Sequence, residues 1–490
     1  MSPAIILISF ILYTLLLFLI SWITSRNADN DSYFIGNRES PWFVVAYGMI
    51  GASLSGVTFV SVPGWVGKTG FTYFLIVLGY VAGYAVVSSI LLPLYYRMNL
   101  TSIYTYLEKR FGSSSYLTGS AFFLVSRIIG ASFRLFLVVS VLQYFVFDHY
   151  GVPFWLTVVI FMLLIQLYTM KGGIKTIVWT DTLQTTFMLL AVIITVAIIV
   201  NSMEVSFMEL FKKVWHSDYS KMIITDVNHS KFFIKQFLSG MFITIVMTGL
   251  DQDMMQKNLS CRNIKDAKKN MTTLSLILVP VNLMFLFLGA VLFIYADTFG
   301  ISLPDKADLV FPSIAIGYLG VAAGIVFIIG LLSAAYSSAD SALTALTTSF
   351  SIDILKLDKK FKDDPARLKK ERIKVHIMMS LVVIGVVILF KIINNESVIA
   401  QLFTLAGYTY GPLLGLYAFG LFTRLQVKDK LVPVIAIIAP VLSYILKVNS
   451  DTIFGGYQIG FELLVINGML TFIGLLLISK RKKLPRETAL

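Results

Sequence analysis

Residues 51–56 read Gly-Ala-Ser-Leu-Ser-Gly, five small or polar residues around one leucine, and they lie inside the apolar stretch 42–67. Such a run favours a break in a helix. At membrane depth, unwound backbone leaves amide and carbonyl groups unpaired, which is tolerable only beside a cavity or an ion. The stretch therefore predicts a broken membrane helix at a binding site. The alternative is that its small residues only allow close helix packing.

The apolar stretch 232–256 contains a second interruption of this kind, Thr-Gly-Leu-Asp-Gln-Asp at residues 248–253. When the first apolar stretch of the chain is numbered zero, the two interruptions fall in core helices one and six. This offset of five helices is what two inverted five-helix repeats produce, with solute and ion sites at their interface.

The composition of the 490 residues places the chain in a membrane. Hydrophobic residues make up 57% and charged residues 14%, whereas a soluble protein has about 45–50% and about 25%. These values exclude a disordered chain, a collagen-like fibre and a disulfide scaffold. The single cysteine and four scattered histidines argue against a Cys-based zinc site or a His-rich metal centre. We therefore expect an all-α integral membrane protein.

A membrane-crossing helix needs about 20 apolar residues, and the sequence contains thirteen stretches of that kind. They are 3–23, 42–67, 71–96, 115–147, 153–170, 174–201, 232–256, 271–296, 314–355, 373–393, 398–423, 429–447 and 461–479. They predict one leading helix, a five-plus-five inverted repeat and two trailing helices. The expected units are 1–41 (leading helix and cytoplasmic approach), 42–201 (first repeat), 202–231 (extracellular loop), 232–424 (second repeat) and 425–490 (trailing helices and basic cytoplasmic tail).

Lysine and arginine residues set the expected orientation. If the N-terminus is outside, the segments assigned to the cytoplasm hold 29 of the 40 basic residues, and the outer segments hold six. The cytoplasmic segments are 24–41, 97–114, 171–175, 257–269 (which begins with Lys257), 356–374, 424–430 and 480–490. We therefore expect a multi-pass protein of the plasma membrane, in contact with lipid, with its N-terminus outside and its C-terminus in the cytoplasm. This arrangement accounts for the formal net charge of +13 without a nucleic-acid partner.

Six charged residues lie deep within apolar stretches, where each costs about 2.5–3.5 kcal/mol if it faces lipid. They are Arg127, Arg134, Asp181, Asp251, Asp253 and Asp340. We expect all six to face a cavity or a partner.

Core helix eight groups oxygen-bearing side chains. Ser337 and Ser341 are four residues apart and Asp340 is three residues from Ser337, so they share one helical face. Hydroxyl and carboxylate oxygens suit a hard cation such as Na⁺. The alternative is that the serines only hydrogen-bond back to helix carbonyls.

Taken together, these residues resemble the sodium:solute symporter family over about 32–425. The motifs that carry the resemblance are SYFIGNRESPWF (32–43), GASLSGVTFVSVP (51–63), KGGIKTIVWTDTLQ (171–184), GLDQDMMQKNLSCRNIKDAKK (249–269), YSSADSALTALTTSFSIDIL (336–355) and GPLLGLYAFGLFTR (411–424). Each motif alone is weak, whereas their order and spacing together are highly specific. The resemblance implies a LeuT-like inverted-repeat fold and alternating access.

The resemblance also implies ion sites at matching positions. The principal Na⁺ site would join backbone carbonyls with two hydroxyls on core helix eight, at Gly51, Leu54, Ala334, Ser337 and Ser338. The second site of some members would fall at Asp181, Ser337, Asp340 and Ser341. Asp340 is a departure, because sialic acid carriers of the family have serine there. Two carboxylates in one pocket could hold a proton, or they could tighten a second Na⁺.

The family pattern points to a solute beside the break in core helix one. The expected contacts are Ser53, Ser55, Thr58, Tyr80, Arg134 and Gln252. The substrate arginine of sialic acid carriers aligns nearest to Gly130, one turn before Arg134, and an arginine can bind a carboxylate through two hydrogen bonds. The alternative is that Arg127, Arg134 or both neutralise Asp181 or the aspartates of core helix six.

Two further assignments concern the broken helix and the aromatic residues of core helix ten. We expect Asp251 and Asp253 to cap or orient the inner half of core helix six. Phe403, Tyr408 and Tyr410 would form an outer lid or, as the simpler interpretation, pack as aromatic residues.

The sequence therefore predicts sodium-driven symport of a small organic solute (a sugar, an acidic sugar or an organic acid) into the cell. Na⁺ would be the coupling ion, no residue would be catalytic, and a symporter of this kind can work as a monomer. A proton-coupled symporter that uses Asp181 and Asp340 is the main alternative. A sodium-independent uniporter or channel is the more distant one, and an enzyme is not expected.

Overall fold

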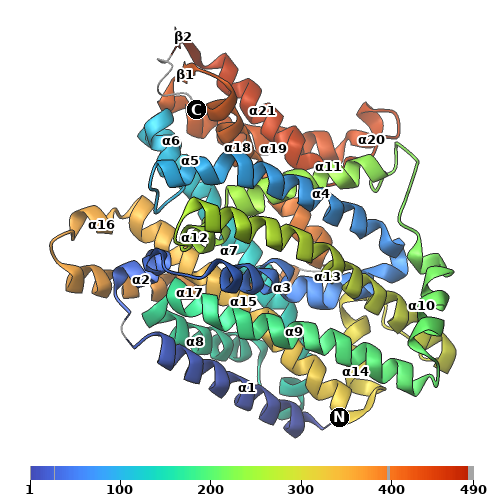
Figure 1. The fold of residues 1–490 in the computed structure, drawn as a ribbon. Helices are drawn as coiled ribbons and strands as arrows, with labels where there is room; N and C mark the ends of the chain where they lie inside the picture. The colour runs from blue at the N-terminus through green and yellow to red at the C-terminus, as the bar shows by residue number, and fades with distance from the viewer. Residues whose placement is uncertain (1, 27, 394–397, 484–490) are drawn as a thin grey trace.

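The computed structural model describes residues 2–26, 28–393 and 398–483. In these ranges the chain is almost entirely helical, which confirms the expected all-α membrane protein (Figure 1). Among the described residues, nine helical stretches are long and apolar enough to cross a membrane, and a bent helix pair would be the tenth. One of the nine, Trp42–Arg97, contains both the second and the third expected stretch. The number of thirteen crossings stays a prediction.

Each expected apolar stretch coincides with at least one helix. These helices are α1 (Pro3–Thr24), α3 (Trp42–Thr69), α4 (Tyr73–Val86) with α5 (Leu92–Arg97), α7 (Ser113–Leu142), α8 (Phe154–Gly172), α9 (Ile174–Ser202), α11 (Phe233–Thr244) with α12 (Gln252–Leu259), α13 (Ile264–Phe299), α15 (Gly320–Ser349), α17 (Pro365–Ile393), α18 (Val398–Phe422), α19 (Val432–Val448) and α21 (Leu463–Leu477). The shorter helices are α2 (Asn30–Ile35), α6 (Thr105–Arg110), α10 (Phe207–Trp215), α14 (Val310–Gly317), α16 (Leu357–Lys360) and α20 (Ser450–Ile453).

Several observed boundaries differ from the expected ones, and two of these differences concern the core helices. The stretch 314–355 divides, because α14 ends at Gly317 and α15 begins at Gly320. Gly320 has a φ of +84°, which glycine adopts at little cost and which stops a helix. The stretch 257–269, expected as a cytoplasmic loop, begins with the last residues of α12.

Helix contacts follow the offset of five that an inverted repeat requires. Core helices one to ten correspond to α3, α4, α7, α8, α9, α11 with α12, α13, α15, α17 and α18. Core helix one packs against seven and two packs against six. In the same way, the contact between core helices three and nine matches the contact between eight and four. The contact between core helices five and eight matches the contact between ten and three. These matched pairs are the contacts that two five-helix repeats of opposite orientation make.

Core helices two and six lie backbone to backbone. A Cβ atom on Gly240 of α11 would come 2.0 Å from the carbonyl oxygen of Ile76 on α4, and one on Gly79 would come 2.1 Å from that of Phe237. Real side chains never approach so closely, so both glycines are required by this contact. Small residues permit such close packing between membrane helices.

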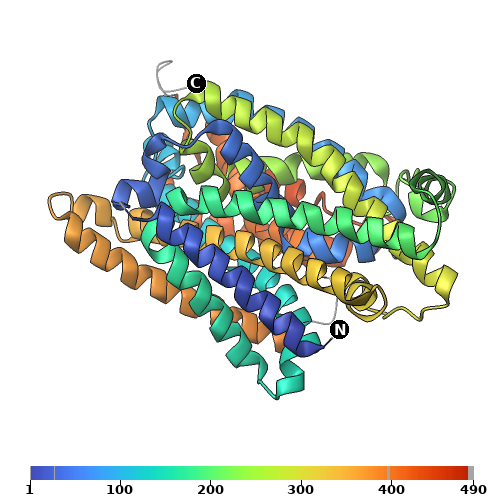
Figure 2. The ribbon, with the colours of Figure 1, turned by 60° about the horizontal axis from the view of Figure 1, so that its bottom comes forward.

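The helices run between two ends of the molecule. Figures 1 and 2 both place α16 at one end and α10 at the other. Strand β1 (Leu425–Val427) pairs antiparallel with β2 (Ser479–Lys483), so the segments before α19 and after α21 lie together. The trailing helices α19 and α21 also pack against each other. Of the expected basic tail, residues 484–490 lie outside the described ranges.

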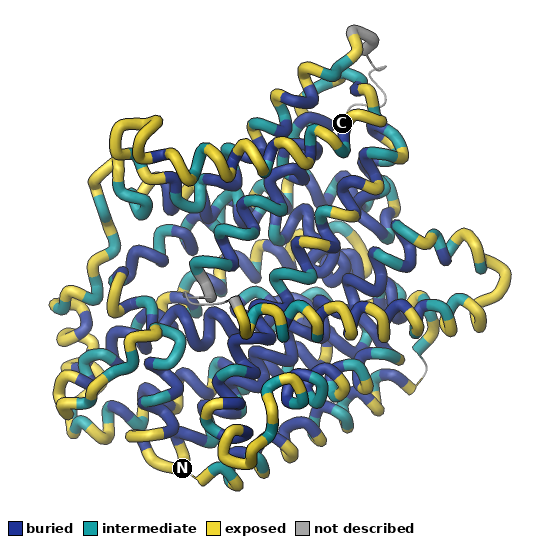
Figure 3. The backbone as a smooth tube through the Cα atoms, turned by 180° about the vertical axis from the view of Figure 1, so that it is seen from behind, coloured by how far each residue is buried: buried dark blue, intermediate teal, exposed yellow. Residues whose placement is uncertain are grey.

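Buried residues gather around α3 and α15, and exposed residues follow the outer helices (Figure 3). Every residue of α15 from Gly330 to Ser349 is buried. Outer helices instead expose large apolar side chains, such as Leu12 and Leu15 of α1 and Val441 of α19. An apolar outer surface around a polar centre suits a lipid environment.

Candidate ion and solute site

The expected break in core helix one is present at Ser55. This residue has a φ of +55° and a ψ of 172°, which are not helical angles. Glycine is almost the only residue that adopts such angles, and they cost other residues of the order of 1–3 kcal/mol. Because the last carbonyls of a helix lack their usual intrahelical partners, the break directs the carbonyls of 51–54 toward other ligands.

The expected break in core helix six is also present. Helix α11 continues as a π-helical turn at Ile245–Gly249, and α12 then leaves at 64°. Asp251 caps α12, because its Oδ1 accepts hydrogen bonds from the backbone N–H groups of Asp253 (2.9 Å) and Met254 (3.4 Å). The prediction that Asp251 caps the inner half-helix is confirmed.

Asp253 pairs with Arg127 of α7, and both side chains are buried. Arg127 also lies 3.8 Å from Asp251, whose second oxygen accepts a 2.5 Å hydrogen bond from the hydroxyl of Tyr410 on α18. The prediction that an arginine neutralises the aspartates of core helix six is therefore confirmed for Arg127. Arg134 has no ion pair or hydrogen bond within the described ranges.

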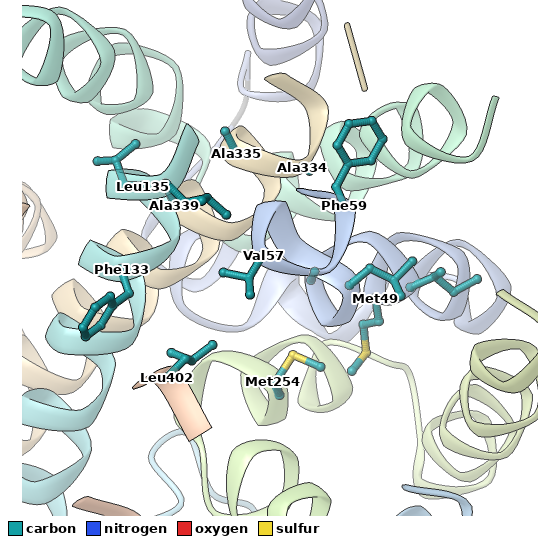
Figure 4. Close-up of a cluster of buried hydrophobic side chains, with 14 of the residues drawn as sticks. Met49, Val57, Phe59, Phe133, Leu135, Met254, Ala334, Ala335, Ala339 and Leu402 are labelled. Atoms are coloured by element: carbon teal, nitrogen blue, oxygen red, sulfur yellow. The ribbon is translucent and has the colours of Figure 1, made fainter. Parts of the chain in front are cut away.

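A cavity with about 750 Å³ of empty space, open solvent included, lies beside the two breaks. Figure 4 shows Val57, Met254 and Leu402, which come from α3, α12 and α18 and line this cavity. The structure brings five of the six expected solute contacts to it, namely Ser53, Ser55, Thr58, Tyr80 and Arg134. The aromatic rings of Tyr73 and Phe403 stack at the cavity, with centroids 6.4 Å apart.

Gln252 does not reach the cavity, which corrects its expected role. Its Nε2 donates to the carbonyl of Thr101 (2.7 Å) and its Oε1 accepts from the N–H of Ile103 (3.0 Å). As the first residue of α12, it points toward the 98–104 segment. Among the aromatic residues of α18, only Phe403 lines the cavity, since Tyr410 contacts Asp251 and Tyr408 packs against Tyr444.

Four polar residues that sequence reasoning missed also line the cavity. They are Tyr84, Thr244, Thr248 and Asn282. A lone amide in an apolar stretch is a signal that could have identified Asn282. Its Oδ1, like the Oγ of Ser53, is buried without a hydrogen-bond partner in the described chain. Both atoms are available to a ligand in the cavity.

The expected sodium ligands of core helix eight lie next to the broken helix. Figure 4 places Ala334 and Ala335 of α15 beside Val57 and Phe59 of α3. The Ser338 hydroxyl donates to the carbonyl of Ala334 (3.0 Å), and the Ser337 hydroxyl donates to Oδ1 of Asp181 (2.7 Å). Each hydroxyl keeps its lone pairs, and hydroxyl and carbonyl oxygens are ligands that suit a hard cation such as Na⁺. The sodium site at 51–54 and α15 stays a prediction.

The Asp181 carboxylate has a partner that sequence reasoning did not foresee. The Nζ of Lys257 lies 2.7 Å from its Oδ2, and each side chain is 1% exposed. Lys257 was expected among the cytoplasmic residues that orient the chain, and this assignment is wrong. It belongs to α12, four residues after Asp253 on the same helical face, which is the signal that could have identified it.

Asp340 of α15 is held by two donors of its own. Its Oδ2 accepts from the hydroxyl of Tyr168 (2.7 Å) and its Oδ1 accepts from the N–H of Ser341 (2.5 Å). The Ser341 hydroxyl is buried and has no partner in the described ranges. The expected second ion site thus brings its residues together on α9 and α15, with an ammonium group beside them.

Two broken helices five apart, matched contacts between repeats and a cavity at the breaks define a secondary transporter with the LeuT-like fold. The profile of the sodium:solute symporter family matches residues 33–427, and the chain belongs to this family. The sodium/sialic acid symporter NanT of Aliivibrio fischeri is 27% identical over 91% of this chain and 88% of its own. SiaT of Proteus mirabilis, also a sodium/sialic acid symporter, is 25% identical over 92% and 91%.

Solved structures agree with this fold. The chain is similar to a sodium-coupled sialic acid symporter in a substrate-bound, outward-open state, with a TM-score of 0.82, 22% identity and coverage of 98% and 99%. Mhp1, a nucleobase-cation-symport transporter, has a TM-score of 0.56 with 16% identity over 91% and 93%. The protein is therefore a sodium-driven symporter of a small organic solute and not an enzyme. The family decides for Na⁺ over the proton as coupling ion.

Proposed function

We propose that this symporter carries a carboxylated sugar of the sialic acid type, and that Arg134 binds the solute's carboxylate. The observation that carries the proposal is the contrast between two arginines of α7 at one cavity. Arg127 is paired with Asp253, whereas Arg134 has no acidic partner within the described part of the chain.

The surroundings of Arg134 favour an anionic ligand. Its side chain is mostly buried, with 8% of the residue exposed, and its Nε has no hydrogen-bond partner in the described ranges. A buried charge without a partner costs several kcal/mol. A solute carboxylate would supply that partner, because guanidinium and carboxylate groups form two parallel hydrogen bonds.

The rest of the cavity suits the hydroxyl groups of a sugar. Hydroxyl side chains from α3, α4 and α11 line it, together with the amide of Asn282. Two relatives over most of the chain are named sodium/sialic acid symporters, which supports the same solute class.

The principal Na⁺ site would use the carbonyls of Gly51, Leu54 and Ala334 with the hydroxyls of Ser337 and Ser338. In this position Na⁺ joins the break of α3 to α15 and favours the state that binds solute. The repeats 42–201 and 232–424 then rock around the occupied site, and the inward-facing state releases both ligands. Coupling requires that ion and solute favour the same state, since equal affinity for both states shifts nothing.

The proposed transporter lies in the plasma membrane as a monomer, surrounded by lipid, with its N-terminus outside. Support comes from the basic segment 356–374, which lies at the end opposite α10 (Figure 1). The aromatic pair Tyr73 and Phe403 then faces the outside. The contacts of Arg127 with Asp253, and of Gln252 with the 101–103 backbone, close the cytoplasmic side.

Uptake into proteoliposomes tests the solute assignment. N-acetylneuraminic acid should accumulate under an inward Na⁺ gradient, and N-acetylmannosamine, which lacks the carboxylate, should not compete. Arg134→Ala should abolish uptake, whereas Arg134→Lys, which keeps the charge without the planar fork, should retain part of it. Equal competition by the neutral sugar, or full uptake by Arg134→Ala, would overturn the proposal.

A further inference from the structure

The Asp181 carboxylate, expected as a ligand of a second Na⁺, already has a cation bound to it. Lys257 Nζ lies 2.7 Å from Oδ2, and the Ser337 hydroxyl donates to Oδ1 at 2.7 Å. Both oxygens of the carboxylate therefore accept short hydrogen bonds. A Na⁺ on Asp181 would have to share this carboxylate with an ammonium group of the same charge, in a site with almost no solvent.

Lys257 has the surroundings of a structural cation. Its side chain is 1% exposed, and Asp181 is its carboxylate partner in the described structure. The pair joins the inner half of core helix six to core helix five, and Ser337 extends the link to core helix eight. A cation bound at the second site would connect core helices five and eight, and the lysine adds core helix six to that link. Moving Lys257 away from Asp181 would leave two uncompensated buried charges. The ion pair therefore holds the ammonium group beside the carboxylate.

The carboxylate of Asp340 is consistent with this arrangement. Tyr168 and the Ser341 backbone N–H donate to the Asp340 oxygens. Both oxygens of Asp340 therefore already accept hydrogen bonds within the protein, and neither needs a bound ion as its partner.

We propose that the Lys257 ammonium occupies the second cation position, so that the protein binds one coupling Na⁺. The inference rests on the proposed principal site at α3 and α15, which would hold that ion. Because Lys257 is covalently part of α12, its charge stays with the protein when the cavity opens to the cytoplasm. Each solute molecule is then transported together with one sodium ion and not with two.

Counting bound sodium tests the inference without any transport measurement. The purified full-length protein would be equilibrated with ²²Na⁺, and bound ions per chain would be determined at saturation. We expect one Na⁺ for the wild type and for Lys257→Arg. We expect two for Lys257→Ala, because Asp181, Ser337, Asp340 and Ser341 then form an unfilled oxygen site. The matched control Asp181→Asn/Lys257→Ala, which removes both charges, should return to one.

Two sodium ions on the wild type would overturn the inference, and so would a folded Lys257→Ala variant that still binds one. The number of sodium ions bound by the wild type tests the inference even if Lys257→Ala does not fold. Ser338→Ala separates this inference from the proposed principal site. It should weaken the binding of the one sodium ion of the wild type by roughly ten- to hundredfold. An unchanged sodium affinity would overturn the principal site, whereas the counts for the Lys257 variants test the second site independently.

Discussion

Arg127 of α7 forms a buried ion pair with Asp253 of α12, and so connects core helix three of the first repeat to core helix six of the second. The pair lies on the side of the cavity away from Tyr73 and Phe403. Opening the cavity on that side requires the two helices to separate. The ion pair therefore stabilises the state in which the cavity is closed toward α16.

Breaking this pair should destabilise the protein. Arg127→Ala leaves Asp253 buried without its partner, and we expect a loss of about 3–5 kcal/mol. The thermal unfolding temperature in detergent would fall measurably. The double variant Arg127→Leu/Asp253→Leu removes both charges and should lose less. An unchanged unfolding temperature for Arg127→Ala would contradict the pairing.

The conformation of Ser55 predicts opposite effects of two substitutions. Ser55→Gly relieves backbone strain of the order of 1–3 kcal/mol and should raise the unfolding temperature. Ser55→Ala keeps the strain and should not raise it. Both variants lose the hydroxyl that lines the cavity, so both should bind N-acetylneuraminic acid more weakly. Equal unfolding temperatures for the two variants would argue against the break at this residue.

Removing the Ser338 hydroxyl should weaken the binding of sodium. A lost ligand of a charged group costs about 1–3 kcal/mol, which corresponds to roughly a ten- to hundredfold change in affinity. We expect this shift for Ser338→Ala in a sodium titration of solute binding. Ser338→Thr keeps the hydroxyl and serves as the control. A normal sodium dependence of Ser338→Ala would place the ion elsewhere.

One Na⁺ with a monoanionic solute should make transport electroneutral. Uptake into proteoliposomes would then not respond to a potassium diffusion potential set with valinomycin. Two Na⁺ would move one net charge, and 100 mV would change accumulation by about 2.3 kcal/mol, or roughly 50-fold. Lys257→Ala, with a second ion, should acquire that response. A strong response of the wild type would contradict the combination of one ion and one anion.

The local sequence pattern was sufficient to predict the two helix breaks and most of the residues that line the cavity. Five small or polar residues around Leu54 favour a break in an apolar helix, and the cap at Asp251 follows from an aspartate before a short helix. The offset of five between these breaks then fixes the repeat. Because Ser53, Ser55 and Thr58 adjoin the first break, their position at the cavity follows as well.

Side-chain partners across helices were not predictable in the same way. Lys257 was counted with the cytoplasmic lysines because an isolated lysine near the end of an apolar stretch has the same sequence pattern whether it is solvated or paired. Its burial depends on where α12 ends and on Asp181, which is 76 residues away. Gln252 was misassigned for a related reason, since its direction depends on the bend after α11 and on the 98–104 segment.

The backbone contact between α4 and α11 provides a constant reference distance for spectroscopic measurements. With no room for even a methyl group at Gly79 or Gly240, the two helices can neither slide nor roll against each other without separating. A pair of spin labels on their outer faces should therefore report a constant distance throughout the transport cycle. Labels placed on α15 or α17 could then be triangulated against this internal reference, which would give the amplitude of the rocking directly.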